Sequence, residues 1–235
     1  MKAMILAAGR GSRLKELTEK TPKPLVRILN KPLIEYHLDN LQQAGFTDVV
    51  INISWLADQL EEYLNNQYEG SLSITIYREE QALETGGGVL AALNDLSCDN
   101  SPFLVINADV MTDFDYANII KEMDTLAHLY LVKNPAQHKE GDFCLGIDGI
   151  LMSKQTKGSE SYTFSGISVL TPQLFADCNA GIFSLAVLFA EYAAKGMISA
   201  ELLSNNWFDV GTLERLKLAS AWQRELQASE LNTGN

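Results

Sequence analysis

Short apolar runs alternate along the chain with amphipathic stretches. Runs typical of buried strands lie at residues 3–7, 49–53, 72–77, 103–106 and 129–132. Between the first two, Leu33, His37 and Leu41 follow i, i+4 spacing, as do Ile34 and Leu38, and Gly45 supplies a helix end. This alternation predicts an α/β fold, with a Rossmann-like, mixed and mostly parallel sheet flanked by helices on both faces.

The pattern changes after Pro135. Shorter β-like pieces follow at 143–147, 149–152 and 162–170, with a Gly- and Ser-rich turn at 158–161. Helical patterns return at 184–195 and 212–227, with a β-like stretch at 206–210 between them. We expect a single domain over residues 1–235 that carries a small β insertion around 135–170, with Lys154 and Lys157 on the surface of that insertion.

Composition narrows the class of protein. The longest apolar runs are far shorter than the roughly 20 residues that cross a bilayer, and the N-terminus lacks the layout of a signal peptide. We therefore expect a cytoplasmic protein without a membrane span. Three cysteines and three histidines are scattered along the chain, so a disulfide framework, a zinc site or a histidine metal site is not expected.

Charge is unevenly distributed. The net charge of −12 argues against nucleic-acid binding, which needs a basic surface. The segment from Arg10 to Lys31, however, contains seven of the 18 basic residues and only two acidic ones, Glu16 and Glu19. A cationic segment in an acidic protein points to a compact anionic ligand such as a phosphate.

The sequence LAAGRGSRL forms a glycine-rich turn directly after the first apolar run. Glycines let backbone N–H groups approach phosphate oxygens, and the arginines add charge. The turn lacks the Gly-Lys-Ser/Thr ending of a P-loop. It also differs from a dinucleotide-binding fingerprint, because Leu14 stands at the position of the third glycine. Phosphate binding and an ordinary tight turn both fit this segment.

Ten residues beyond Arg13, Lys23 stands between Pro22 and Pro24. Flanking prolines restrict the backbone, so Lys23 should be held in a defined position, although a solvated turn lysine is the alternative.

These two motifs together resemble the sugar-1-phosphate nucleotidyltransferases, whose usual form has Thr where this chain has Ser12. The similarity extends over nearly the whole chain through the motifs ETGGG at 84–88, NAD at 107–109, FSGI at 164–167 and DVGT at 209–212. Within that family the chain resembles the bacterial N-acetylmuramic acid 1-phosphate uridylyltransferases of cell-wall recycling. The resemblance implies a GT-A-like fold, UTP and a sugar 1-phosphate as substrates, and a monomer or small homo-oligomer.

Two aspartates follow apolar β-like stretches, Asp109 after 103–106 and Asp209 after Trp207 and Phe208. Open α/β sheets bind ligands at the carboxyl ends of strands, although a solvent-facing residue or a helix cap is the alternative. The resemblance implies that both hold Mg²⁺, that Arg13 binds the leaving pyrophosphate, and that Lys23 binds the α-phosphate and the sugar phosphate.

The resemblance also implies residues for the two substrates, with plain turn geometry as the alternative for the glycines and solvated charges for Glu84 and Asp142. The expected nucleotide-binding residues are Ala7, Ala8, Gly9, Gly11, Ser12, Gly86, Gly87 and Asn107. The expected sugar-binding residues, centred on the β-rich segment, are Glu84, Asp142, Gly146, Ser165 and Gly166.

The expected products are UDP-N-acetylmuramic acid and pyrophosphate. Alternative enzymes are a mannose-1-phosphate guanylyltransferase or another nucleotide-sugar pyrophosphorylase, and phosphocholine cytidylyltransferases share the Gly-Ser-Arg form of the loop. A further alternative is a regulatory subunit without catalysis. This alternative is disfavoured because the chain retains all four of the residues Arg13, Lys23, Asp109 and Asp209.

Overall fold

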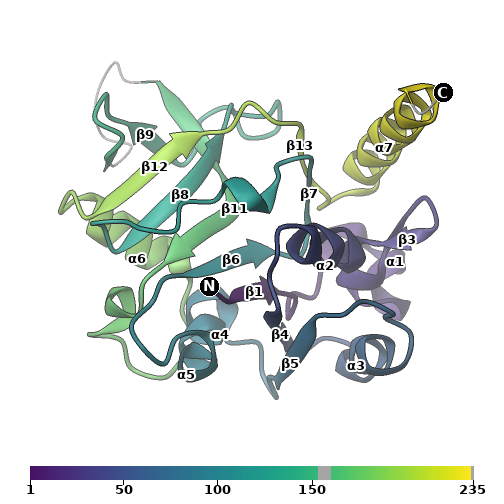
Figure 1. Ribbon diagram of the computed structural model, residues 1–235, viewed down its shortest axis with the longest axis horizontal. Coiled ribbons are helices and arrows are strands. Elements are labelled where there is room, and N and C mark those ends of the chain that lie inside the picture. The colour runs from purple at the N-terminus through teal and green to yellow at the C-terminus, as the bar shows by residue number, and fades with distance from the viewer. Residues whose placement is uncertain (153–159, 234–235) are drawn as a thin grey trace.

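The computed structural model describes residues 1–152 and 160–233, and within these residues its centre is a nine-stranded sheet (Figure 1). The strands are β1 (Ala3–Leu6), β4 (Asp48–Ile53), β5 (Ser73–Arg78), β6 (Phe103–Asn107), β8 (Ala127–Val132), β9 (Phe143–Leu145), β10 (Leu151–Met152), β11 (Ser161–Leu170) and β12 (Ile198–Leu202). The main path runs β10-β9-β11-β6-β1-β4-β5, while β8 pairs with β11 and β12. The predicted fold class is confirmed.

The half of the sheet formed by β6, β1, β4 and β5 is parallel. Side chains alternate between its faces, so Ala3 and Ile5 enter one core while Met4 enters the other. The helices α2 (Leu33–Gln43) and α3 (Ala57–Asn66) pack in the first core. In the second core pack α4 (Glu84–Ala91), α5 (Leu93–Leu96) and α6 (Leu185–Ala193).

The other half of the sheet depends on β11. This strand runs antiparallel to β6 and β8, and its first residues pair with β9. Although the sequence pattern assigns 162–170 to a β insertion, β11 is a strand of the main sheet, which ties the β-rich segment to the core. Lys154 and Lys157, expected on that segment's surface, lie outside the described residues.

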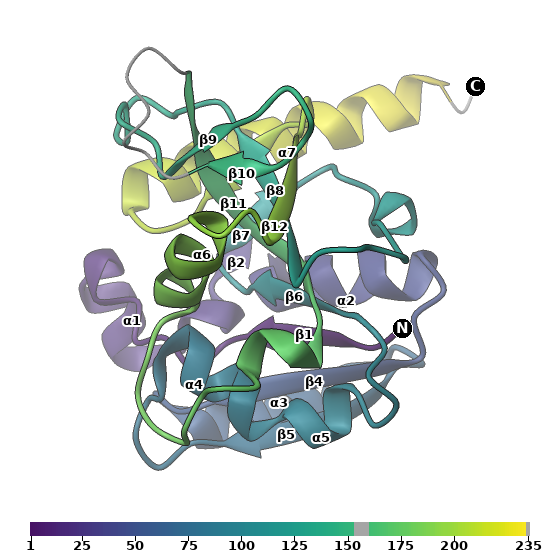
Figure 2. The ribbon, with the colours of Figure 1, turned by 90° about the vertical axis from the view of Figure 1, so that its left-hand side faces the viewer.

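The remaining elements are short, apart from the C-terminal helix α7. They are η1 (Ser12–Leu14), α1 (Glu16–Lys20), η2 (Lys23–Leu25), β2 (Arg27–Ile28), β3 (Lys31–Pro32), β7 (Val110–Thr112), η3 (Tyr116–Asn118), η4 (Pro172–Phe175), β13 (Trp207–Asp209) and α7 (Leu213–Thr233). A third apolar cluster joins Leu14, Ile28, Met111, Val210 and Ala219, and so fastens the start of α7 against the turn. The C-terminal end of α7 projects beyond the rest of the chain (Figure 1 and Figure 2). Within the described residues, every helix is too short or too polar to cross a bilayer.

Candidate active site

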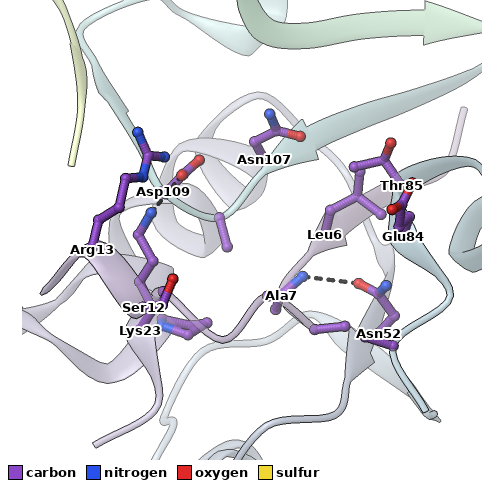
Figure 3. Close-up of a pocket in the computed structure, with 16 residues that line it drawn as sticks. Leu6, Ala7, Ser12, Arg13, Lys23, Asn52, Glu84, Thr85, Asn107 and Asp109 are labelled. Carbon is purple, nitrogen blue, oxygen red and sulfur yellow. Dashed lines mark hydrogen bonds and ion pairs between the residues drawn. The ribbon is translucent and has the colours of Figure 1, made fainter. Parts of the chain in front are cut away.

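Two adjoining cavities lie at the carboxyl ends of the parallel strands. The first has a volume of about 410 Å³ and is lined from the ends of β1 and β6, the glycine-rich turn and the start of α4 (Figure 3). The second, of about 470 Å³, lies between β11, β13, α7 and the segment that follows β8. Both are lined by Arg13, Asn107 and Asp109. Two ligands bound in these cavities would therefore meet at these three side chains.

The glycine-rich turn leaves the end of β1 and forms one wall of the first cavity. Of its expected nucleotide-binding residues, Ala7, Ala8, Gly9, Gly11 and Ser12 all line this cavity. Gly11 has φ +65°, and a Cβ there would lie 3.1 Å from the Cβ and the Cδ of Lys23. Glycine therefore permits both the left-handed backbone and the close approach of the lysine stem.

A buried polar chain fixes the beginning of this turn. The Ala7 N–H donates to Asn52 Oδ1 (2.8 Å), and Asn52 Nδ2 donates to Glu79 Oε1 (2.8 Å). Glu79 Oε2 in turn accepts from the Leu83 N–H at the entrance to α4. Asn52 and Glu79 are buried, so this chain ties the two walls of the first cavity together. The sequence interpretation named neither residue, because an Asn in a strand and a Glu in a loop carry no motif.

Lys23 and Asp109, which both line the first cavity, form an ion pair. Lys23 lies in η2, its side chain is only 10% exposed, and its Nζ is 2.5 Å from Asp109 Oδ2 (Figure 3). A largely buried ammonium group requires such a partner. The pair therefore places one positive and one negative group where both cavities meet.

The short β7–β13 ladder brings the two predicted metal-binding aspartates to the same cavity. Asp209 pairs with Val110 in register, and the Val210 N–H donates to the Asp109 carbonyl (2.8 Å). Both carboxylates line the second cavity. Asp209 Oδ2 is paired with Arg215, whereas the buried Asp209 Oδ1 has no hydrogen-bond partner among the described residues.

Arg13, Asp209 and Arg215 converge around Gly211. A Cβ on this glycine would lie 2.6 Å from Arg215 Nη2, 2.9 Å from Asp209 Oδ1 and 3.1 Å from Arg13 Cζ. Thr212 caps α7, since its Oγ1 accepts from the Arg215 N–H (3.3 Å). Arg215 was missed from the sequence, where a basic residue in the first turn of a long helix is typical of a solvated face.

The expected sugar-binding residues divide between several places. Asp142, Ser165 and Gly166 line the second cavity. Glu84 lines the first cavity instead, beside Thr85. Gly146 is not among the described residues that line either cavity; it lies in the turn between β9 and β10, where its N–H donates to the Ile150 carbonyl (2.9 Å).

Gly86 and Gly87 are buried within α4 and are not among the described lining residues of either cavity. Their N–H groups donate to the Phe183 carbonyl at 2.8 and 3.1 Å. A Cβ on Gly87 would lie 2.2 Å from the Gly181 carbonyl oxygen. These glycines therefore let the chain at 181–183 pack directly on α4, and that wall of the first cavity depends on the packing.

The three histidines have different surroundings. His37 is buried with Nδ1 2.8 Å from the Tyr116 hydroxyl, and His128 is also buried; burial lowers the pKa of each to about 4. His138 lines the second cavity, with Nε2 2.9 Å from Asp142 Oδ1. The sequence interpretation assigned it no site role. In the described part of the chain, no three His, Cys, Asp or Glu side chains gather as a metal site.

Comparisons with known proteins agree with this geometry. A family model described as "Nucleotidyl transferase" matches residues 2–143. The N-acetylmuramate alpha-1-phosphate uridylyltransferase of Neisseria meningitidis is 42% identical, over 95% of this chain and 100% of its own length. The mannose-1-phosphate guanyltransferase beta-A of Xenopus laevis is 30% identical, over 90% of this chain and 61% of its own length.

A solved structure shares the fold. A putative glucose-1-phosphate thymidylyltransferase from Bacillus anthracis, in complex with a sucrose, superposes with a TM-score of 0.81 at 23% identity, covering 95% of each chain. The family match and the Neisseria relative confirm the resemblance seen in the glycine-rich turn and the Pro-Lys-Pro segment. The chain belongs to the nucleotidyl transferase family.

Proposed function

We propose that this chain is a uridylyltransferase that converts UTP and N-acetylmuramic acid α-1-phosphate into UDP-N-acetylmuramic acid and pyrophosphate. The observation that carries the proposal is the match to a relative of that activity along that relative's whole length. Two adjoining cavities with shared residues Arg13, Asn107 and Asp109 also suit a reaction between two phosphorylated substrates.

In the proposed arrangement, UTP occupies the first cavity and the sugar phosphate the second. A phosphate monoester has a second pKa of about 6, so its oxygen is already deprotonated at neutral pH and needs no protein base. That oxygen attacks the α-phosphorus of UTP, the bond from the α-phosphorus to the bridging oxygen breaks, and pyrophosphate departs in line. The protein contributes by positioning both phosphates and stabilising the developing charge.

Lys23 and Arg13 supply that charge. Lys23 lines the first cavity, and we assign its ammonium group to the α-phosphate and the incoming sugar phosphate. Arg13 lines both cavities, and we assign it to the departing pyrophosphate. Because Asp109 already holds Lys23 in place, little reorganisation is needed when the phosphates arrive.

We further propose that Asp109 and Asp209 bind Mg²⁺. The buried, unpartnered Oδ1 of Asp209 and the neighbouring Asp109 carboxylate fit this ion, which prefers oxygen ligands and commonly takes one or two carboxylates together with substrate phosphates. When bound, Mg²⁺ neutralises part of the phosphate charge. Removal of the ion with EDTA should abolish turnover and Mg²⁺ should restore it. Full activity in EDTA would contradict this assignment.

The competing function is a mannose-1-phosphate guanylyltransferase, favoured by the 30% identity to such a relative. Pyrophosphate release separates the two. We would measure it with the 1-phosphates of N-acetylmuramic acid, N-acetylglucosamine, glucose and mannose, each against UTP, dTTP, GTP and CTP. Preference for mannose 1-phosphate with GTP by about tenfold, or ~1.4 kcal/mol of transition-state stabilisation, would replace the proposed function with the competing one.

A further inference from the structure

The charged side chains of the second cavity belong to two groups of elements. One group comes from η1, the β6–β7 connection, β13 and α7, and contains Arg13, Asp109, Asp209 and Arg215. These are the groups that the proposed function assigns to phosphate chemistry or that pair with them. The other group comes from the segment after β8 and contains His138 and Asp142, beside the uncharged Pro135 and Gln137.

One hydrogen bond to an anchored carboxylate and a well-anchored loop hold the His138 ring. Its Nε2 lies 2.9 Å from Asp142 Oδ1, and the other oxygen of Asp142 accepts from the Phe164 N–H (2.9 Å). The loop itself is fastened by Asn134, whose Nδ2 donates to the Lys139 and Ser161 carbonyls. The His138 side chain is 42% exposed, so part of the imidazole remains accessible to a ligand.

We propose that His138 determines specificity for the sugar by binding the lactyl carboxylate of N-acetylmuramic acid; this inference rests on the proposed function. The carboxylate is attached away from the anomeric phosphate and cannot share the cations that serve the phosphate. Arg13 lies at the phosphate junction, and Arg215 is paired with Asp209. Among the remaining described lining residues, His138 is the one that can carry a positive charge.

The hydrogen bonds of this arrangement determine the protonation state of the His138 ring. An imidazole that bonds Asp142 through Nε2 and a ligand carboxylate through Nδ1 must donate from both nitrogens, and so it is protonated. Asp142 is a positioning residue in this arrangement, because it orients the imidazole and leaves the ligand contact to His138. Binding of the muramic acid substrate should therefore take up a proton at the ring, which an uncharged sugar substituent would not require.

Substrate selectivity provides the first test. The ratio of kcat/KM for N-acetylmuramic acid 1-phosphate to that for N-acetylglucosamine 1-phosphate should fall about 10- to 100-fold in His138→Gln, because a charged hydrogen bond is lost. Lys139→Gln is the matched control: it removes one charge from the adjacent exposed residue, which is not a lining residue of the second cavity, and should leave the ratio unchanged. An unchanged ratio in His138→Gln would overturn the inference.

Proton uptake provides the second test, which a merely structural role would not affect. Titration calorimetry in buffers of different ionisation enthalpy would compare the two sugar phosphates in the presence of α,β-methylene-UTP. The muramic acid ligand should take up more protons than its N-acetylglucosamine counterpart, and His138→Gln should remove the difference. If the wild-type protein took up the same number of protons with both sugar phosphates, the proposed role of His138 would be refuted. If the wild-type protein turned over no muramic acid substrate, the proposed function itself would fail.

Discussion

Replacement of Gly211 by alanine should impair catalysis while leaving the fold intact. The added Cβ would lie 2.6 Å from Arg215 Nη2 and 2.9 Å from Asp209 Oδ1, whereas ordinary contact begins at 3.4 Å. The guanidinium nitrogen must therefore move by about 0.8 Å, and the carboxylate oxygen by about 0.5 Å. Both atoms are the ends of side chains, and the backbone of Gly211 is outside the left-handed region, so the shifts fall on functional groups rather than on the fold.

A displacement of about 1 Å in a catalytic constellation costs about 100-fold in rate. We therefore expect kcat in Gly211→Ala to fall about 30- to 100-fold, equivalent to ~2 to 2.7 kcal/mol. The melting temperature should fall by less than about 4 °C, the shift produced by ~1 kcal/mol in a chain of this size. Pyrophosphate release and thermal unfolding measure the two effects.

Gly181→Ala is the matched control, because within the described chain no heavy atom beyond its two chain neighbours lies within 4 Å of the position its Cβ would occupy. Its activity should stay near that of the wild type. Wild-type kcat in a folded Gly211→Ala protein would refute the reasoning that Arg13, Asp209 and Arg215 form one catalytic cluster.

Three further predictions concern single groups of the site. Asp109→Asn and Asp209→Asn should each fold yet lose about 100-fold or more in kcat, since an amide is a poor Mg²⁺ ligand; a near-normal rate in either folded variant would exclude that residue. Arg13→Ala and Lys23→Ala should reduce kcat/KM far more than Lys121→Ala, a variant of an exposed loop lysine outside both cavities, and equal effects would mean that only general charge matters. Gly87→Ala should act through stability, because its Cβ would lie 2.2 Å from a backbone oxygen; urea unfolding should show a loss of about 1–3 kcal/mol, and an unaltered midpoint would show that the packing can relax.

The sequence predicted those parts of the fold whose pattern repeats. The apolar runs that became β1, β4 and β6 are long enough to read as buried strands, and the stripe through Leu33, Leu38 and Leu41 reads as α2. The β-like stretch at 206–210 contains β13, but its partner β7 has only three residues and is too short for any period to appear. Yet their ladder is what brings Asp109 and Asp209 to one cavity.

Local motifs predicted cavity-lining residues better than the residues that support them. Arg13 and Lys23 each belong to a short continuous motif, the glycine-rich turn and the Pro-Lys-Pro segment. Such motifs can be recognised from the sequence alone. The Asn52–Glu79 chain and the Asp209–Arg215 pair join segments distant in sequence or on different elements, and only the folded chain shows them. The motif that contains Gly86 and Gly87 suggested contact with the nucleotide. In the structure, close packing of the chain at 181–183 explains why α4 has glycine at these positions.

A competition reaction tests the central claim most directly. The purified protein with Mg²⁺ would receive equal concentrations of UTP and GTP together with equal concentrations of N-acetylmuramic acid 1-phosphate and mannose 1-phosphate, and mass spectrometry would identify the nucleotide sugars at low conversion. We predict that UDP-N-acetylmuramic acid exceeds every other product by about tenfold or more. GDP-mannose as the main product would contradict the account.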